Sequence, residues 1–375
     1  MKVAVVIPVI YRPYGVRESL LLAKSLADEG AKVEVLIHTA DSDAFTDIKN
    51  HLGNLAVFCL NSKKHLRPSH AKYLFHQLTR RLDRELANVL KERHAIDRYD
   101  AIIVCANEGH WIPEYVLKWR TDSRPVLGVY VQELIDHVIL LRRERSFGIV
   151  RSFLSALLPL LHFIEQKRLS LFDVMLPNSK WTSQILRYLY GFETDMIISI
   201  LDLKTFARPA DAVRKDYIAL PTSSLDENAK SIAVRLFSEG IKLISYGPEC
   251  VNPVPYVGFL SDSEMIKFLS EAKATLFLFD YEGLGLIPLE SLAVGTPVIT
   301  YDKQGPLSAL EAAPNDCVLF GHTYEDLRNY CNQFIHSESP PCKECVDFMT
   351  VFSPERYAKQ LICILRECEE RQDGN

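Results

Sequence analysis

The feature that most constrains the fold is a repeated alternation of short apolar runs and amphipathic helical stretches. Runs such as VAVVIPVI (3–10) and ATLFLF (274–279) have the length of buried strands, and segments with helical periodicity separate such runs. Parallel strands need crossover helices, so the pattern predicts an α/β protein with doubly wound parallel sheets. Polar, proline-containing sequence at 200–216 interrupts the alternation and predicts two domains.

The expected elements can be given by residue number. We expect strands at 3–10, 32–38, 100–106, 125–131, 173–177 and 196–200 in the first half of the chain, and at 217–220, 242–246, 255–259, 274–279 and 298–301 in the second. We expect helices that begin near residues 16, 112, 179, 226 and 354.

Charge is distributed unevenly between the two halves. Residues 1–190 hold 27 Lys and Arg against 20 Asp and Glu, and the remainder holds 16 against 28, within a net charge of −5. The basic, leucine-rich stretches 61–81 and 137–172 therefore suggest contact with an anionic membrane surface. Ordinary core helices with solvated charges are the alternative. No recognition motif accompanies the basic residues, so nucleic acid is not an expected partner.

No apolar run reaches the length of a transmembrane helix. The N-terminal residues enter a strand at once and show no signal-peptide cleavage site, so export is not expected. We therefore expect a cytoplasmic protein that associates peripherally with the membrane if the basic stretches bind lipid.

The segment YEGLGLIPLESLAVGTPVITY (281–301) places two glutamates around a glycine-rich turn. The preceding apolar run predicts a strand, Pro288 suits the first position of a helix, and Gly295 suits the residue after it. Glu282 is thus expected at the carboxyl end of a strand and Glu290 in the first helical turn. In open α/β sheets this crevice is where ligands bind.

The same segment resembles the Glu-x7-Glu signature of the retaining family 4 glycosyltransferases, which have the GT-B fold. The similarity extends to LFDVMLPNSKWTSQILRYLYG (171–191) and FSPERYAKQLICIL (352–365). The resemblance implies two Rossmann-like domains that face a cleft. An acceptor-binding domain would span 1–205 and a nucleotide-sugar-binding domain 206–352, while a terminal helix at about 353–375 would pack back on the first domain.

The resemblance also implies roles for the motif. Glu290 would bind the ribose and Glu282 the donor sugar, because carboxylates accept strong hydrogen bonds from paired hydroxyls. Backbone N–H groups at the helix start would receive the diphosphate; they belong to Gly283, Leu284, Gly285 and Leu286. As the alternative, Glu290 complements the helix dipole and Glu282 is a surface acid. The glycines, the proline and the flanking strands together favour the functional interpretation.

The chain departs from the family pattern on the diphosphate side. Thr222 and Ser223 stand where the family has an arginine, and Lys230 is the nearest cation in sequence. Hydroxyls bind phosphate more weakly than a bidentate guanidinium. Donor affinity, and with it activity, is therefore expected to be weaker than in family members that carry the arginine. In the first-domain loop, Gly15 is a single glycine where the family commonly has a pair.

A second departure concerns a histidine that the family often carries after the strand at 125–131. Gln132 and Glu133 occupy that place and are our candidates for the acceptor side. His110, one strand earlier, is the candidate catalytic replacement. Its alternative is an exposed loop histidine without a functional role.

These residues predict the transfer of a sugar, with retention, from a nucleotide-sugar to a hydroxyl of a lipid-linked or glycan acceptor. No metal or other cofactor is expected. The sequence DSD (41–43) is similar to a metal-binding Asp-x-Asp but comes too early in the chain, and we interpret it as a solvated, helix-capping loop. Two alternatives stay open: an epimerase or hydrolase acting on sugar nucleotides with the same fold, and an inactive relative that only binds a ligand or partner enzyme.

Five of the nine cysteines lie in the last 45 residues: Cys331, Cys342, Cys345, Cys363 and Cys368. The pair in CKEC (342–345) has the spacing of zinc ligands, but no second closely spaced pair accompanies it. Inert thiols are therefore the expected state, ahead of a disulfide and of a metal site.

Overall fold

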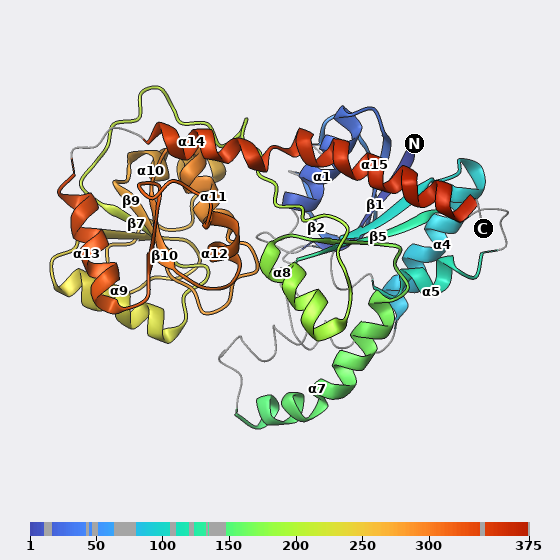
Figure 1. The fold of residues 1–375 in the computed structure, drawn as a ribbon, viewed down its shortest axis with the longest axis horizontal. Coiled ribbons are helices and arrows are strands. Elements are labelled where there is room, and N and C mark those ends of the chain that lie inside the picture. The colour runs from blue at the N-terminus through green and yellow to red at the C-terminus, as the bar shows by residue number, and fades with distance from the viewer. Residues whose placement is uncertain are drawn as a thin grey trace.

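The computed structural model of the protein describes most of the chain (Figure 1). The described residues are 1–10, 17–42, 45–46, 52–63, 80–105, 110–119, 124–132, 134, 148–337 and 342–373, with only the backbone for 148–157 and 373. The candidate residues Gly15 and Glu133, and the basic segments 64–79 and 137–147, lie outside them.

Six parallel strands form the sheet of the first domain in the order β3-β2-β1-β4-β5-β6. The strands are β1 (Lys2–Ile10), β2 (Lys32–Asp41), β3 (Ala56–Lys63), β4 (Ala101–Cys105), β5 (Val126–Val131) and β6 (Val174–Pro177). Every residue of the central strand β1 is buried. Such burial on both faces is what a parallel strand between two helical layers requires.

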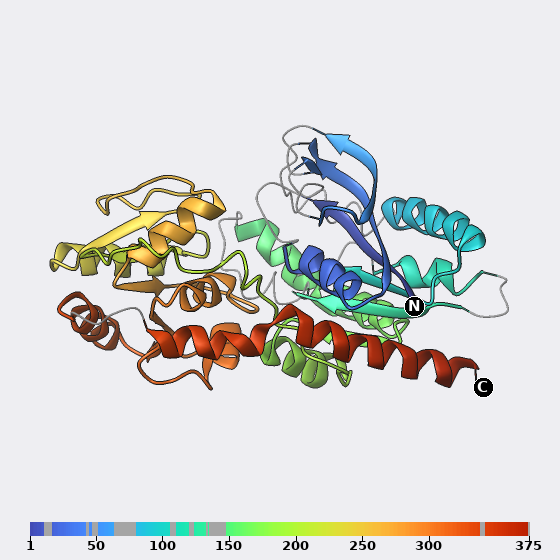
Figure 2. The same ribbon diagram turned by 90° about the horizontal axis from the view of Figure 1, so that it is seen from above.

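Helices cover both faces of this sheet (Figures 1 and 2). One face shares a hydrophobic core with α1 (Arg17–Asp28) and α15 (Pro354–Asp373). The other packs against α4 (Arg81–Ile96), α5 (Ile112–Val116), α7 (Gly148–Leu169), α8 (Lys180–Ile185) and the π-helical turn η2 (Leu186–Tyr190). None of the described helices is long and apolar enough to cross a membrane.

The second domain repeats the plan with five parallel strands in the order β11-β10-β9-β7-β8. They are β7 (Ile218–Pro221), β8 (Leu243–Tyr246), β9 (Ala274–Phe277), β10 (Val298–Tyr301) and β11 (Val318–Gly321). One face packs against α10 (Asp262–Glu271), α11 (Leu286–Ala293), α12 (Gln304–Leu310) and α14 (Lys343–Met349). The other packs against α9 (Glu227–Ser238) and α13 (Tyr324–Ile335). The predicted pair of doubly wound domains is confirmed.

The chain crosses between the domains at two neighbouring places. Leu201, in the segment after η2, donates its N–H to the carbonyl of Phe352, 3.2 Å away, in the short turn η3 (Thr350–Phe352) before α15. From there α15 runs along the first domain and packs on α1 (Figure 2). The helix begins at Pro354, as its proline predicts.

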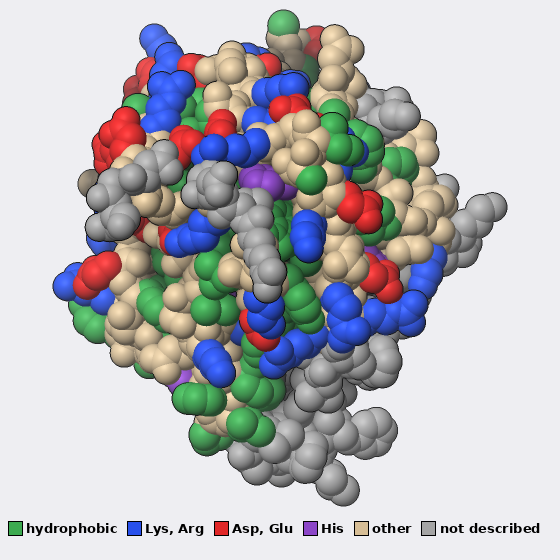
Figure 3. Space-filling model, turned by 90° about the vertical axis from the view of Figure 1, so that its right-hand side faces the viewer, with side chains coloured by type: hydrophobic (Ala, Val, Ile, Leu, Met, Phe, Trp, Pro, Cys, Tyr) green, Lys and Arg blue, Asp and Glu red, His purple; other side chains and the backbone are tan. Residues whose placement is uncertain are grey.

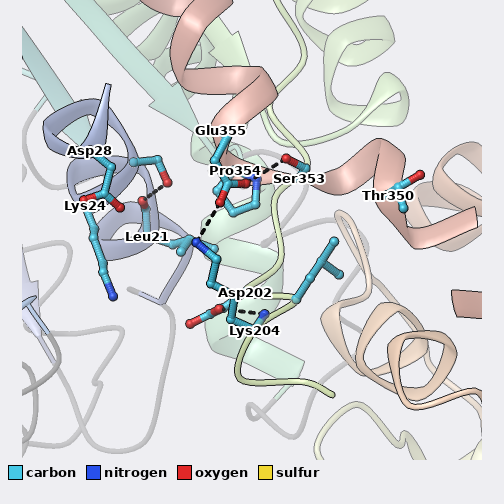
Figure 4. Close-up of a pocket in the computed structure, with 11 residues that line it drawn as sticks. Leu21, Lys24, Asp28, Asp202, Lys204, Thr350, Ser353, Pro354 and Glu355 are labelled. Carbon is cyan, nitrogen blue, oxygen red and sulfur yellow. Dashed lines mark hydrogen bonds and ion pairs between the residues drawn. The ribbon is translucent and has the colours of Figure 1, made fainter. Parts of the chain in front are cut away.

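A cavity of about 400 Å³ lies at this crossing (Figure 4). Lys24 and Asp28 of α1 line it together with Lys204 of the linker and Glu355 of α15, and Lys204 pairs with Glu355 at 3.0 Å. None of the residues that line it is one of the predicted site residues.

Two predicted strands are wrong. Residues 196–200 form no ladder with β6: the Ile198 N–H donates to the Pro177 carbonyl at 2.8 Å, and the Ile198 carbonyl accepts from the Tyr130 hydroxyl at 3.2 Å. Residues 255–259 form only an isolated bridge from Ser245 to Tyr256. Pro255 lacks an N–H to donate. Helix α4 was not predicted, although its buried residues recur at helical spacing.

Candidate functional site

The carboxyl edges of the two sheets meet at the glycine turn between β9 and α11. Gly283 lies so close to the first domain that a Cβ there would be 2.8 Å from the Gln132 carbonyl oxygen. Ser179, the residue before α8, donates its hydroxyl to the Gly283 carbonyl at 2.6 Å. Only glycine fits this approach, so the turn is where the domains touch.

The first residues of α12, in the same domain, bind the turn. The Glu282 N–H donates to Gln304 Oε1 at 2.8 Å, and the Gly305 N–H donates to the Glu282 carbonyl at 3.1 Å. Gly305 is required, because a Cβ there would lie 2.1 Å from the Gly283 carbonyl oxygen. The turn therefore keeps one shape while its own backbone donors stay available.

Helix α11 begins two residues earlier than predicted, at Leu286, so Pro288 is its third residue and Glu290 lies in the second turn. A proline is accepted there because first-turn N–H groups have no partner inside a helix. Among the described residues, the N–H groups of Gly283, Leu284 and Gly285 have no hydrogen-bond partner. Together with the start of α11 they form a set of donors suited to an anion.

Glu290 is buried beside this turn and reaches the first domain. Its carboxylate accepts from the Arg17 guanidinium, at the start of α1, at 3.2 Å. Arg17 also pairs with Asp262 at the start of α10. Burial raises the pKa of Glu290 to about 7, and the Arg17 charge only partly offsets the effect of burial.

A second buried carboxyl, Glu18, faces the same crevice. It accepts from the Tyr130 hydroxyl at 2.9 Å and from the Gln132 amide at 3.0 Å. Burial raises the pKa of Glu18 to about 7, and the nearby charges of Glu282 and Glu290 add to the shift. Glu18 and Glu282 thus lie near Glu290, which binds Arg17 together with Asp262.

The remaining second-domain candidates lie on the loop after β7 and, for Lys230, in α9. The buried Thr222 hydroxyl donates to the Tyr246 carbonyl at 3.1 Å, whereas the side chain of Ser223 is exposed. Ser224, the next residue, donates its hydroxyl to Glu282 at 3.2 Å. Lys230 pairs with Glu227 and Glu249, so its charge is already balanced by carboxylates.

His110 occupies a different place. It is fully buried, so the alternative of an exposed loop histidine is wrong. Its Nδ1 lies 2.9 Å from Glu165 of α7, which also binds Arg168, and burial lowers the pKa of His110 well below its usual value. None of the contacts described for His110 reaches Glu282 or Glu290. The structure thus places His110 in a buried network of the first domain.

Asp41 of the DSD segment also differs from expectation. It ends β2 and is 1% exposed, so it is not part of a solvated loop, and Asp43 lies outside the described residues. Sequence reasoning missed Arg17 and Glu18 altogether. Their one signal was their place directly after the turn that follows β1, at the carboxyl edge of the sheet.

Comparisons with known proteins agree with this geometry. Residues 244–348 match the family of group 1 glycosyl transferases. The chain is 24% identical over 141 residues to ORF378 of Acidianus filamentous virus 2 (isolate Italy/Pozzuoli), a candidate glycosyltransferase, and this match spans 36% of each chain.

Solved structures are similar over nearly the whole length. Sucrose-phosphate synthase (tll1590) from Thermosynechococcus elongatus has a TM-score of 0.74 and 15% identity, with 98% of both chains covered. Anabaena Alr3699/HepE in complex with UDP and glucose has a TM-score of 0.69 and 13% identity, with 98% of this chain and 100% of that chain covered. A glycosyltransferase from Rickettsia africae has a TM-score of 0.64 and 13% identity. The chain therefore has the GT-B fold of glycosyltransferases, and its segment with Glu282 and Glu290 matches their group 1 family.

Proposed function

We propose that the chain is a retaining glycosyltransferase that takes its sugar from a nucleotide-sugar. The observation that carries the proposal is the buried Glu290 carboxylate beside a turn with unpartnered N–H groups. Such a site offers acceptors to ribose hydroxyls and donors to a diphosphate. The similar Anabaena protein was solved in complexes with UDP and with UDP-glucose, which supports this class of donor.

In this proposal Glu290 binds the ribose, Glu282 binds the donor sugar, and the N–H groups of Gly283 to Leu286 bind the diphosphate. Arg17 changes partner during binding. When ribose hydroxyls occupy the Glu290 carboxylate, the guanidinium is released next to the turn and neutralises the diphosphate. Arg17 thereby supplies the cation that Thr222 and Ser223 do not.

The reaction breaks the bond between the anomeric carbon and the diphosphate oxygen and forms one between that carbon and the acceptor oxygen. The acceptor hydroxyl gives its proton to the departing diphosphate on the same face of the sugar, which retains the anomeric configuration. No separate base is needed, since positioning and charge stabilisation lower the barrier.

Thermal unfolding with a panel of nucleotide-sugars tests donor binding. A ligand at a hundredfold its dissociation constant adds about 2.7 kcal/mol of stability. Product analysis with an acceptor then separates the alternatives. A glycoside with the anomeric configuration of the donor indicates a retaining transferase, free sugar indicates a hydrolase, and an altered sugar nucleotide indicates an epimerase. Stabilisation without any product would indicate an inactive relative.

We propose that no metal acts at the donor site, so transfer continues in excess chelator and is not stimulated by added Mn²⁺. Loss of activity in chelator, restored by Mn²⁺ and abolished in Asp41→Asn, would instead favour the Asp-x-Asp interpretation of residues 41–43.

We also propose an acceptor anchored in lipid, reached through the surface of α7 and η2. Leu160 and Phe163 of α7 are 55% and 61% exposed, and Tyr188 and Leu189 of η2 are 75% and 52% exposed. The rings of Tyr190 and His162 pack against each other with their centroids 4.4 Å apart, so η2 contacts α7. Figure 3 shows hydrophobic side chains near the lower edge of the first domain and Lys and Arg side chains across the same face. Apolar anchors beside basic groups suit an anionic interface.

Sedimentation with anionic liposomes tests this surface. Replacing Leu160 and Phe163 by Ser should reduce binding, and so should replacing Arg142, Arg143 and Arg145, because each basic group near the surface contributes about 1 kcal/mol. Binding should weaken as salt rises. Val213→Ser, at an exposed apolar residue outside the surface, is the control. A wild-type chain that ignores anionic liposomes at low salt would point to a soluble acceptor.

A further inference from the structure

Three cysteine thiols converge at one edge of the second domain. Cys317 lies just before β11, Cys342 just before α14, and Cys345 within α14. Their Sγ atoms all lie within 4.8 Å of one another, and those of Cys317 and Cys342 are 3.3 Å apart. Cys317 and Cys345 are buried, and Cys342 is partly exposed. The fold thus adds a distant third thiol to the CKEC pair.

This spacing fits a bound metal ion. Zinc–sulfur bonds of about 2.3 Å in a tetrahedral site hold the sulfur atoms roughly 3.8 Å apart. Small side-chain rotations would bring the three thiols to that separation. The carboxylate of Glu344, an oxygen 3.6 Å from Cys342 Sγ, lies on the partly exposed side, where it or water can complete the coordination.

A partly buried cation lies beside the cluster. The Arg214 guanidinium donates to the carbonyls of Ala272 and Gly295 and to Thr296 Oγ1. Among the described residues all of these acceptors are neutral, so this partly buried positive charge lacks a carboxylate partner, and removing a charge from water without a counter-charge is costly. The Gly295 carbonyl also accepts from the Cys342 N–H at 3.0 Å, so this one carbonyl links Arg214 to the cluster.

We propose that Cys317, Cys342 and Cys345 bind one thiophilic divalent cation of the zinc type as a structural clamp. With water as the fourth ligand, three thiolates and one such ion carry a net charge of −1, which the charge of Arg214 balances. Thiols are protonated near neutral pH, so binding converts three S–H groups to metal thiolates and releases three protons to solvent.

The clamp would act on structure rather than on chemistry. It ties the loop before β11 to α14, which packs on α11 and leads through η3 into α15. The cluster adjoins the end of α11 opposite the glycine turn, so the ion does not touch Glu282. The inference therefore stands apart from the proposed transfer reaction.

Metal binding to the full chain tests the proposal with Zn²⁺ and Co²⁺ alone. Protein purified under reducing conditions without chelator should hold one zinc per chain by elemental analysis. Co²⁺ exchanged into it should give thiolate-to-metal charge-transfer absorption, and zinc added to chelator-treated protein should release three protons and raise Tm. Cys345→Ser should lose these properties, whereas Cys331→Ser, at a buried cysteine outside the cluster, should keep them.

If Cys345→Ser does not fold, Cys342→Ser at the partly exposed position gives the same reading, since it removes one of three ligands. Zinc content below one tenth per chain in the wild type, or equal content in wild type and both variants, overturns the proposal. A Cys317–Cys342 disulfide found by peptide mapping in metal-poor protein also overturns it. Nucleotide binding measured alongside separates this result from the donor site.

Discussion

Two buried acidic clusters in this molecule look alike by residue type and differ in their balance of charge. In the first domain, Glu165 lies between Arg168 and His110, and the arginine neutralises it. Between the domains, Glu290 and Asp262 bind Arg17, and Glu18 and Glu282 lie near Glu290. Burial there raises the pKa of two glutamates to about 7.

The difference separates a structural cluster from a candidate binding site. A neutralised ion pair inside a domain gains nothing from a ligand, whereas the buried Glu18 and Glu290 carboxyls, whose pKa burial raises, gain when ligand hydroxyls replace their lost hydrogen bonds to water. Arg17 and Glu290 lie on different domains, so we expect that a ligand between the domains can replace Arg17 as the partner of Glu290. His110, by contrast, is held by the balanced cluster.

The largest effect is expected from breaking the balanced cluster. Glu165→Gln leaves Arg168 buried without its counter-charge, which should cost about 3–5 kcal/mol of unfolding free energy. Denaturant unfolding measures it. The folded Glu165→Gln variant should bind nucleotide as the wild type does. A loss of nucleotide affinity with unchanged stability would mean that this cluster belongs to the binding site.

The raised pKa of Glu18 should show in the pH dependence of stability. The unfolded Glu18 titrates near 4.5 and the folded one near 7, so the native state keeps a proton that the unfolded state has lost in between. Stability should therefore fall as pH rises from about 4.5 to about 7 and stay level above, by at most about 3 kcal/mol for this group. Glu18→Gln should remove this contribution and leave the similar one of Glu290. An unchanged slope would contradict a raised pKa at Glu18.

Glu290→Gln tests the comparison through nucleotide affinity. It keeps the shape but removes the charge, and nucleotide binding should weaken by roughly 1.5–3 kcal/mol, the scale of a charged hydrogen bond. Isothermal titration with the nucleotide measures it. In the wild type, affinity should also fall as pH drops below about 7, because a protonated Glu290 accepts fewer hydrogen bonds. An unaltered dissociation constant for Glu290→Gln would show that Glu290 does not bind the ribose.

The smallest effect is expected at Asp262, the second partner of Arg17. Both side chains are partly exposed, and such pairs contribute about 0.2–1 kcal/mol. Asp262→Asn should therefore lower unfolding free energy by less than about 1 kcal/mol, and 0.5 M salt should lower it similarly in the wild type. A loss as large as that at Glu165 would show that the crevice, too, depends on a fixed ion pair.

Much of the fold could be predicted from the sequence because its signals are local. The apolar run before Glu282 and the positive-φ Gly295 after α11 act within a few residues, and both are as expected. Contacts between distant segments gave no such signal. Arg17 meets Glu290 across 273 residues, and Cys317 joins CKEC only when β11 pairs with β10. The roles of the site residues stay predictions.

The helix α15 has a consequence for how the protein is made. Ala358, Leu361 and Leu365 complete the core that β1 and α1 begin, although the whole second domain is synthesised in between. At roughly 5–20 residues per second, a ribosome needs on the order of ten to thirty seconds to pass from β6 to α15. During that interval the nascent first domain exposes an apolar groove along α1. The domain that is synthesised first is thus completed only after the second domain has been made.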